Sequence, residues 1–83
     1  MVEENIGTIQ HYFPHIHVAA VLITKGSLTI GDTIHIVGAH TDFSQKVESM
    51  QVNNEPVHIA QPHDEVGIKV NDRVREHDIV YKD

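Results

Sequence analysis

The 83-residue chain contains no cysteine and no tryptophan. Without cysteine it has no disulfide framework, no thiolate zinc site and no cysteine nucleophile, so a domain of this size depends on its hydrophobic core. The lack of disulfides favours a reducing environment, and we expect a cytoplasmic protein. The N-terminal residues are acidic where a secretory signal is basic, which supports the same expectation.

Long hydrophobic runs and basic residues are also scarce. The longest apolar run covers only residues 18–23, far below the roughly 20 residues that a membrane helix needs, so we expect no membrane interaction. Six Lys and Arg stand against twelve Asp and Glu, a formal charge of −6. This charge opposes long-range attraction to nucleic acid, so any RNA contact has to be local.

Nucleotide and hydrolytic chemistry lack sequence motifs as well. The chain has no phosphate-binding G-x-x-x-x-G-K-[ST] loop and no base-reading N-K-x-D motif, so we expect no GTP binding. Ser27, Ser44 and Ser49 lie outside any recognisable nucleophile elbow. Asp64 and Glu65 are neighbours that point to opposite faces of a strand. We therefore predict a protein that is not an enzyme and uses no cofactor.

What the chain does contain is a series of short alternating apolar segments. Isoleucine or valine alternates with other residues in Thr33–Val37 and Glu65–Val70, as in half-buried strands. Gly, Pro, Asn and Asp separate such segments, and no long helical period occurs. Six strands are predicted: Asn5–Phe13, His17–Thr24, Thr33–Val37, Gln45–Val52, Glu65–Val70 and Asp78–Lys82.

Six short strands without a helix can bury their apolar faces only against one another, and closing the sheet removes edges that promote aggregation. We therefore predict an all-β fold, a small closed six-stranded antiparallel barrel formed by residues 1–83 as a single domain. Phe13 is assigned to the core, whereas Phe43 is expected to be the most exposed aromatic residue. The other predicted core residues are Ile9, Val21, Ile34, Ile36, Val47, Val66, Ile68 and Ile79.

Four segments resemble a known family. Leu28–Ile36 reads L-T-I-G-D-T-I-H-I and resembles the L-x-x-G-D-x-I-x-I hairpin of the second domain of translational GTPases such as elongation factor Tu. Lys46–Gln51 resembles the central strand of that domain. Ala60–Ile68 is similar to its A-x-x-G-D-x-V-G-I segment, and Val74–Val80 to its closing strand. Order and spacing match over roughly residues 6–82, so the resemblance implies the barrel of domain two.

Two residues depart from the family pattern. His63 and His77 stand directly before aspartate, where the family usually has glycine. That position often needs a left-handed backbone, which histidine adopts at a cost of about 1 kcal/mol. The resemblance therefore predicts strained turns at these two residues.

The resemblance also implies a class of function. In elongation factor Tu the domain helps to hold the aminoacylated end of tRNA, which implies a non-catalytic binding module for RNA, a ribosomal component or a translation-related protein. The chain also resembles small standalone translation-factor-like proteins and the C-terminal barrel of collagenase-like peptidases. The alternative is therefore an accessory module that binds the substrate or a partner of such a peptidase. The oligomeric state stays open.

The positive charge is concentrated toward the C-terminal strands. Arg73 and Arg75 project to the same side of an extended segment, and Lys69 and Lys46 add to the patch. We predict that these four residues contact RNA or a partner. The alternative is that they are solvated and paired with neighbouring acidic residues.

Histidine is abundant, with eight residues in the chain. In an extended backbone His15 and His17 lie on one side about 6–7 Å apart, within reach of one metal ion. Asp42 or His40 could complete such a site only through the fold. The alternative is a solvated hairpin tip, because a turn at Pro14 breaks the alternation.

Overall fold

The structure is a computed structural model that describes residues 3–83. Those residues form ten β-strands and no helix, which confirms the predicted all-β class. None of them belongs to a helix with the length and hydropathy of a membrane span. The strands are β1 (Glu4–Phe13), β2 (Val18–Ile23), β3 (Leu28–Thr29), β4 (Thr33–Gly38), β5 (Thr41–Lys46), β6 (Met50–Val52), β7 (Glu55–Pro56), β8 (Ile59–Ala60), β9 (Glu65–Lys69) and β10 (Ile79–Lys82).

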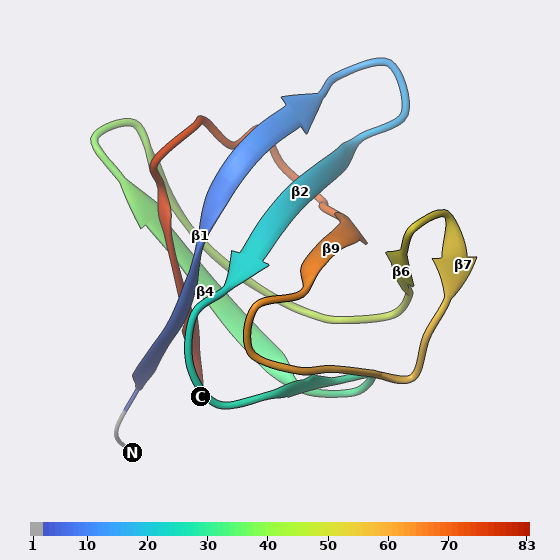
Figure 1. The fold of residues 1–83 in the computed structure, drawn as a ribbon. Helices are drawn as coiled ribbons and strands as arrows, with labels where there is room; N and C mark the ends of the chain where they lie inside the picture. The colour runs from blue at the N-terminus through green and yellow to red at the C-terminus, as the bar shows by residue number, and fades with distance from the viewer. Residues whose placement is uncertain (1–2) are drawn as a thin grey trace.

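Eight strands form one antiparallel sheet in the order β5-β4-β10-β1-β2-β9-β6-β7, and β3 pairs with β8 in a second, two-stranded sheet. The large sheet curls, so that β4 passes behind β1 and β2 (Figure 1). The predicted six strands and their closure into a barrel are not confirmed. Within residues 3–83, no backbone ladder joins the outer strands β5 and β7. The segment predicted as one strand, Gln45–Val52, is divided between the end of β5 and β6.

A side chain links β5 to the chain that follows β9. Gln45 is only 8% exposed. Its Nε2 donates a hydrogen bond to the Lys69 carbonyl oxygen at 2.9 Å, and its Oε1 accepts one from the Asn71 N–H at 2.7 Å. An amide side chain carries both a donor and an acceptor, as a peptide group does. The Gln45 side chain therefore forms with the chain after β9 the kind of hydrogen bonds that a neighbouring strand would form.

The core is one cluster of buried aliphatic side chains enclosed by the curled sheet. Of the eight aliphatic residues predicted as core, seven are buried and Ile79 is the exception. Ile79 is only half-buried, because β10 turns its neighbour Val80 inward, where Val80 pairs with Ile36 of β4. The prediction for Ile79 is therefore wrong by one position in the strand.

Both predictions for phenylalanine are wrong. Phe13 is 45% exposed, whereas Phe43 is partly buried and packs against the core. The pairing of β1 with β2 shifts between Ile9 and His11, which marks a β-bulge. A bulge inserts one extra residue and so reverses the alternation beyond it. Tyr12 consequently packs against the core, and Phe13 faces outward.

Three turns share one geometry, in which an aspartate forms hydrogen bonds with the residue three positions earlier. They span Thr29–Asp32, Gln61–Asp64 and Arg75–Asp78. In each turn the aspartate N–H donates to the carbonyl of the first residue, and a carboxylate oxygen accepts from that residue's N–H at 2.9 Å. The residue before each aspartate has a positive φ, as the third residue of a type II turn does: Gly31 (99°), His63 (77°) and His77 (76°). The predicted left-handed backbone at both histidines is confirmed.

Candidate functional site

An apolar groove lies between the β1–β2 hairpin, β9 and the β6–β7 hairpin. Figure 1 shows β9 between β2 and the β6–β7 hairpin, with the loop of the β1–β2 hairpin reaching out beyond β2. The groove has a volume of about 590 Å³, within the range of sites that bind small molecules or side chains. Its apolar lining comprises Phe13, Ile16, Val18, Ala20 and Val52. We call this surface the apolar groove.

The floor of the apolar groove is the outer face of β2 and β9. Because side chains alternate along β2, Ala19 and Val21 face the core and leave Val18 and Ala20 on the outside. Ala20 pairs with Gly67 of β9. Two residues with minimal side chains thus lie side by side, and the sheet surface is hollow at this point.

The wall at the hairpin end consists of two exposed apolar residues. Phe13 is 45% exposed and Ile16 is 60% exposed; in residues 3–83, only Ile59 joins them as a strongly exposed large hydrophobic residue. The Ile16 N–H donates to the Phe13 carbonyl oxygen at 3.3 Å, which ties the turn to the end of β1. Clustered exposed apolar side chains are typical of interaction sites.

The rim of the apolar groove is polar and acidic. Among the residues described by the structure, Asp64 and Glu65 are the charged side chains that line it, together with Asn53, Asn54 and His63. Asp64 Oδ2 accepts the Gln61 N–H at 2.9 Å and is held in the turn before β9. Glu65 is exposed at the start of β9. Sequence reasoning missed this surface, because it placed Phe13 in the core.

Arg73 and Arg75 lie together in a second, open depression of about 470 Å³, with His11, Tyr12 and Glu76. His11 Nδ1 and Glu76 Oε2 are 3.2 Å apart, and both side chains are more than half exposed. We call this surface the arginine depression. The structure therefore brings the two predicted arginines to one surface, as their spacing indicates, and their binding role stays a prediction.

The two predicted lysines lie elsewhere. Lys69 is on β9 and Lys46 is at the end of β5, and neither lines the arginine depression. The carbonyl oxygens of both lysines accept from Gln45 Nε2, at 2.9 Å for Lys69 and 3.4 Å for Lys46. A contact of Lys46 and Lys69 with RNA or a partner stays a prediction.

His15 and His17 lie in the turn that joins β1 to β2, not in an extended segment. His17 has a φ of 55°, so the side-by-side spacing expected for a strand does not apply. Within residues 3–83, no three His, Asp or Glu side chains gather into a group that could hold a metal ion. A two-histidine metal contact stays a prediction.

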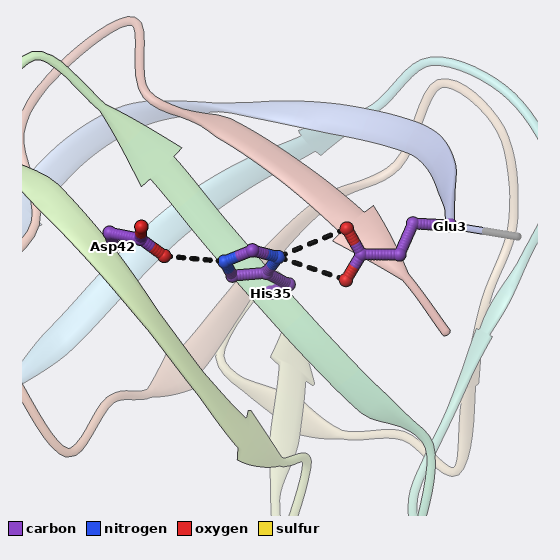
Figure 2. A network of polar contacts seen from close by, with 3 residues as sticks. All are labelled: Glu3, His35 and Asp42. Atoms are coloured by element: carbon purple, nitrogen blue, oxygen red, sulfur yellow. Dashed lines mark hydrogen bonds and ion pairs between the residues drawn. The ribbon is translucent and has the colours of Figure 1, made fainter. Parts of the chain in front are cut away.

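A polar network around His35 also escaped sequence reasoning. His35 on β4 lies between the carboxylates of Glu3 and Asp42 (Figure 2). Its Nδ1 is 2.9 and 3.0 Å from the two Glu3 oxygens, and its Nε2 is 2.6 Å from Asp42 Oδ1. The hydrogen bond to Asp42, followed by that to Glu3, raises the pKa of His35 above 6.5. A protonated imidazole donates from both nitrogens, so this arrangement favours the cation.

Comparison with known proteins places the fold. Residues 17–77 match the family described as elongation factor Tu domain 2. The chain belongs to this family. It is 40% identical over 77 residues to an uncharacterized protease of Methanocaldococcus jannaschii, a match that covers 92% of this chain and 19% of the protease. The chain thus spans about a fifth of the length of that relative.

Two solved structures share this elongation factor Tu domain 2 fold. The C-terminal domain of a putative U32 peptidase from Geobacillus thermoleovorans aligns with a TM-score of 0.89 and 22% identity, over 96% of this chain and 92% of that one. Its selenomethionine variant aligns with a TM-score of 0.87 and 21% identity, over 93% and 96%. The resemblance stated from sequence motifs, both to domain two and to the peptidase barrel, is confirmed.

Proposed function

We propose that this chain is a non-catalytic module that binds the polypeptide substrate or a polypeptide partner of a U32-type peptidase. The observation that carries the proposal is the apolar groove, where Phe13 and Ile16 are exposed beside a hollow sheet surface. A groove with an apolar floor and wall and a polar rim suits a short segment of polypeptide. The relatives supply the context, since the similar proteins are a protease and a peptidase domain.

A binding role fits the side chains of the apolar groove better than a catalytic one. Its lining within the described residues includes no serine, threonine or lysine to act as a nucleophile. The Asp64 carboxylate is engaged by the Gln61 N–H. Because the chain corresponds to about a fifth of the M. jannaschii protease, peptide hydrolysis is expected from the remainder of such a protein.

A second candidate function is contact with RNA, a ribosomal component or a translation-related protein. One observation favours it, because Arg73 and Arg75 line the same depression and both can contact phosphate. The formal charge of −6 disfavours nucleic acid at long range. Glu76 and His11 in the arginine depression already pair with each other.

The test compares two ligands on the same protein. Fluorescently labelled lysozyme, kept unfolded by reduction and carboxymethylation, and bulk tRNA are each titrated with the chain. We expect the unfolded polypeptide to bind, and Phe13→Ser to weaken it by about tenfold, because an exposed aromatic anchor is lost. The paired variant Arg73→Ala/Arg75→Ala should leave polypeptide binding unchanged. Binding of tRNA alone, lost in the arginine variant and steeply weakened by salt, contradicts the proposal and supports the second candidate.

A further inference from the structure

The rim of the apolar groove carries charge of one sign. Asp64 and Glu65 are the two acidic residues that line the groove, and no lysine or arginine lines it within residues 3–83. Asp64 is held by the Gln61 N–H. Among residues 3–83, Glu65 forms no ion pair and no side-chain hydrogen bond. The Glu65 carboxylate is therefore available to a ligand.

Glu65 lies on the same strand as Gly67, which forms part of the floor of the apolar groove. On β9, Glu65 and Gly67 are two residues apart and lie on the same face of the sheet. Gly67 pairs with Ala20, which forms the hollow, and Glu65 pairs with Leu22 of the same strand. One strand repeat, about 6–7 Å, separates the backbones of Gly67 and Glu65 along β9. When an extended ligand places one side chain in the hollow, its side chain two positions along is therefore the one that points toward Glu65.

We propose that the apolar groove binds an extended polypeptide segment in which a bulky apolar residue stands two positions from lysine or arginine, with the apolar side chain between Phe13, Ile16 and Ala20 and the cation at Glu65. This inference rests on the proposed function and names the class of segment. A basic residue at that position gains a charge pair at the rim, whereas an acidic residue faces two carboxylates.

Charge complementarity also favours a basic polypeptide over RNA or a second copy of the chain as the occupant of the apolar groove. Phosphate groups of RNA would meet Asp64 and Glu65 at the rim and would be repelled. A second copy of the chain carries the same formal charge of −6, which opposes self-association through an acidic rim. The negative charge of the whole chain attracts a basic segment and raises its rate of association.

The experiment uses three labelled peptides that share one sequence with a central phenylalanine and differ only at the residue two positions from it, which is Lys, Gln or Glu. Binding to the full chain is measured by fluorescence anisotropy at about pH 8, where unperturbed histidine is neutral. At low salt we expect the Lys peptide to bind about threefold more tightly than the Gln peptide, as an exposed ion pair allows. The Glu peptide should bind most weakly, and high salt should reduce the differences.

Variants locate the effect. Glu65→Gln should remove most of the difference in affinity between the Lys and Gln peptides, and Phe13→Ser should weaken all three. Glu48→Gln is the matched control, because Glu48 is exposed and lies outside the apolar groove, and the change removes the same charge. The control should keep the preference for lysine.

The possible results distinguish a failure of the charge preference from a failure of the proposed function. Equal binding of the three peptides, still weakened by Phe13→Ser, overturns the charge preference and leaves a polypeptide-binding module. A lysine preference that is as large in Glu65→Gln as in the wild type overturns the assignment of Glu65. If neither the peptides nor unfolded lysozyme bind, both the charge preference and the proposed function are wrong. Both are also wrong if the chain binds tRNA and Phe13→Ser removes that binding.

Discussion

Asp78 and Arg75 close the turn that leads into β10. The Arg75 N–H donates to Asp78 Oδ2 at 2.9 Å, and the Asp78 N–H donates to the Arg75 carbonyl oxygen at 3.2 Å. Asp78 is only 4% exposed, so its carboxylate is desolvated and relies on such bonds. His77, between them, has a φ of 76°. The turn thus combines a buried carboxylate with a residue in a strained conformation.

His77→Gly should stabilise the fold. A left-handed conformation costs a residue with a Cβ about 1–2 kcal/mol, whereas glycine adopts it freely but loses more entropy on folding. The expected net gain in the free energy of unfolding is about 0.5 kcal/mol, measured by urea unfolding. His58→Gly is the control, because His58 is exposed and has no positive φ. Equal destabilisation by the two substitutions contradicts strain at His77.

Gly38→Ala should destabilise the fold. A Cβ at Gly38 would overlap the Asp78 carboxylate, which is buried and held by the Arg75 N–H. Relieving the overlap requires β4 or the turn to shift, at a cost of about 1–3 kcal/mol. Gly67→Ala is the control, because the nearest atom to its Cβ would be at an ordinary 3.5 Å. Thermal unfolding of both variants tests the difference, and similar melting temperatures contradict it.

Gln45→Ala should loosen the junction between β5 and the chain after β9. The substitution leaves the Lys69 carbonyl and the Asn71 N–H without the partner they have in the wild type. These hydrogen bonds are partly buried, and the loss of such a bond costs about 1 kcal/mol. Amide hydrogen exchange should accelerate at Asn71, whereas Gln10→Ala, at an exposed site, should not change it. Unchanged protection at Asn71 would show that Gln45 does not hold this junction.

Ile68→Ala should be among the most damaging changes in the core. Ile68 is fully buried on β9 and pairs with Ala19 of β2 and Met50 of β6. Truncation of a buried isoleucine costs about 2–5 kcal/mol through lost transfer energy and a cavity. Ile59→Ala is the control at a residue that is 45% exposed. Denaturant unfolding with a shift in midpoint no larger for Ile68→Ala than for Ile59→Ala contradicts the assignment.

Period-two alternation was enough to predict part of the core. It worked for Ile34 and Ile36 and for Val66 and Ile68, because each pair lies in one regular strand. It failed for Phe13, because the bulge between Ile9 and His11 shifts the phase and has no local signal in the sequence. The apolar groove was missed for that reason.

Contacts between distant segments were likewise beyond prediction. Glu3 and His35 are 32 residues apart in sequence, and the registers of β1, β10 and β4 bring them together. Arg73 and Arg75, by contrast, were expected on one surface because they are two positions apart in an extended segment. Short-range spacing is readable in a sequence, whereas register is a property of the whole sheet.

The Glu3–His35–Asp42 network should make stability depend on pH. The two carboxylates raise the pKa of His35 in the folded state above 6.5. The groups facing His35 are Glu3 from the start of the chain, Asp42 from β5 and the Tyr81 ring of β10, whose centroid is 6.4 Å away. Since protonated His35 is favoured by folding, its stabilisation is complete below the unfolded pKa and is lost as pH rises through the folded one.

The wild type should therefore exceed His35→Gln in stability by more at about pH 5.5 than at about pH 8.5. The change should be on the order of 0.5 kcal/mol, because the pairs are partly exposed and screened by solvent. Urea unfolding across this range gives the difference, and subtraction of the variant cancels the other seven histidines. An NMR titration of the His35 ring adds a direct test. Asp42→Asn and Glu3→Gln should each lower its pKa, because the hydrogen bonds to the Asp42 and Glu3 carboxylates both raise it. A stability difference that stays constant with pH would show that the carboxylates do not hold the imidazolium.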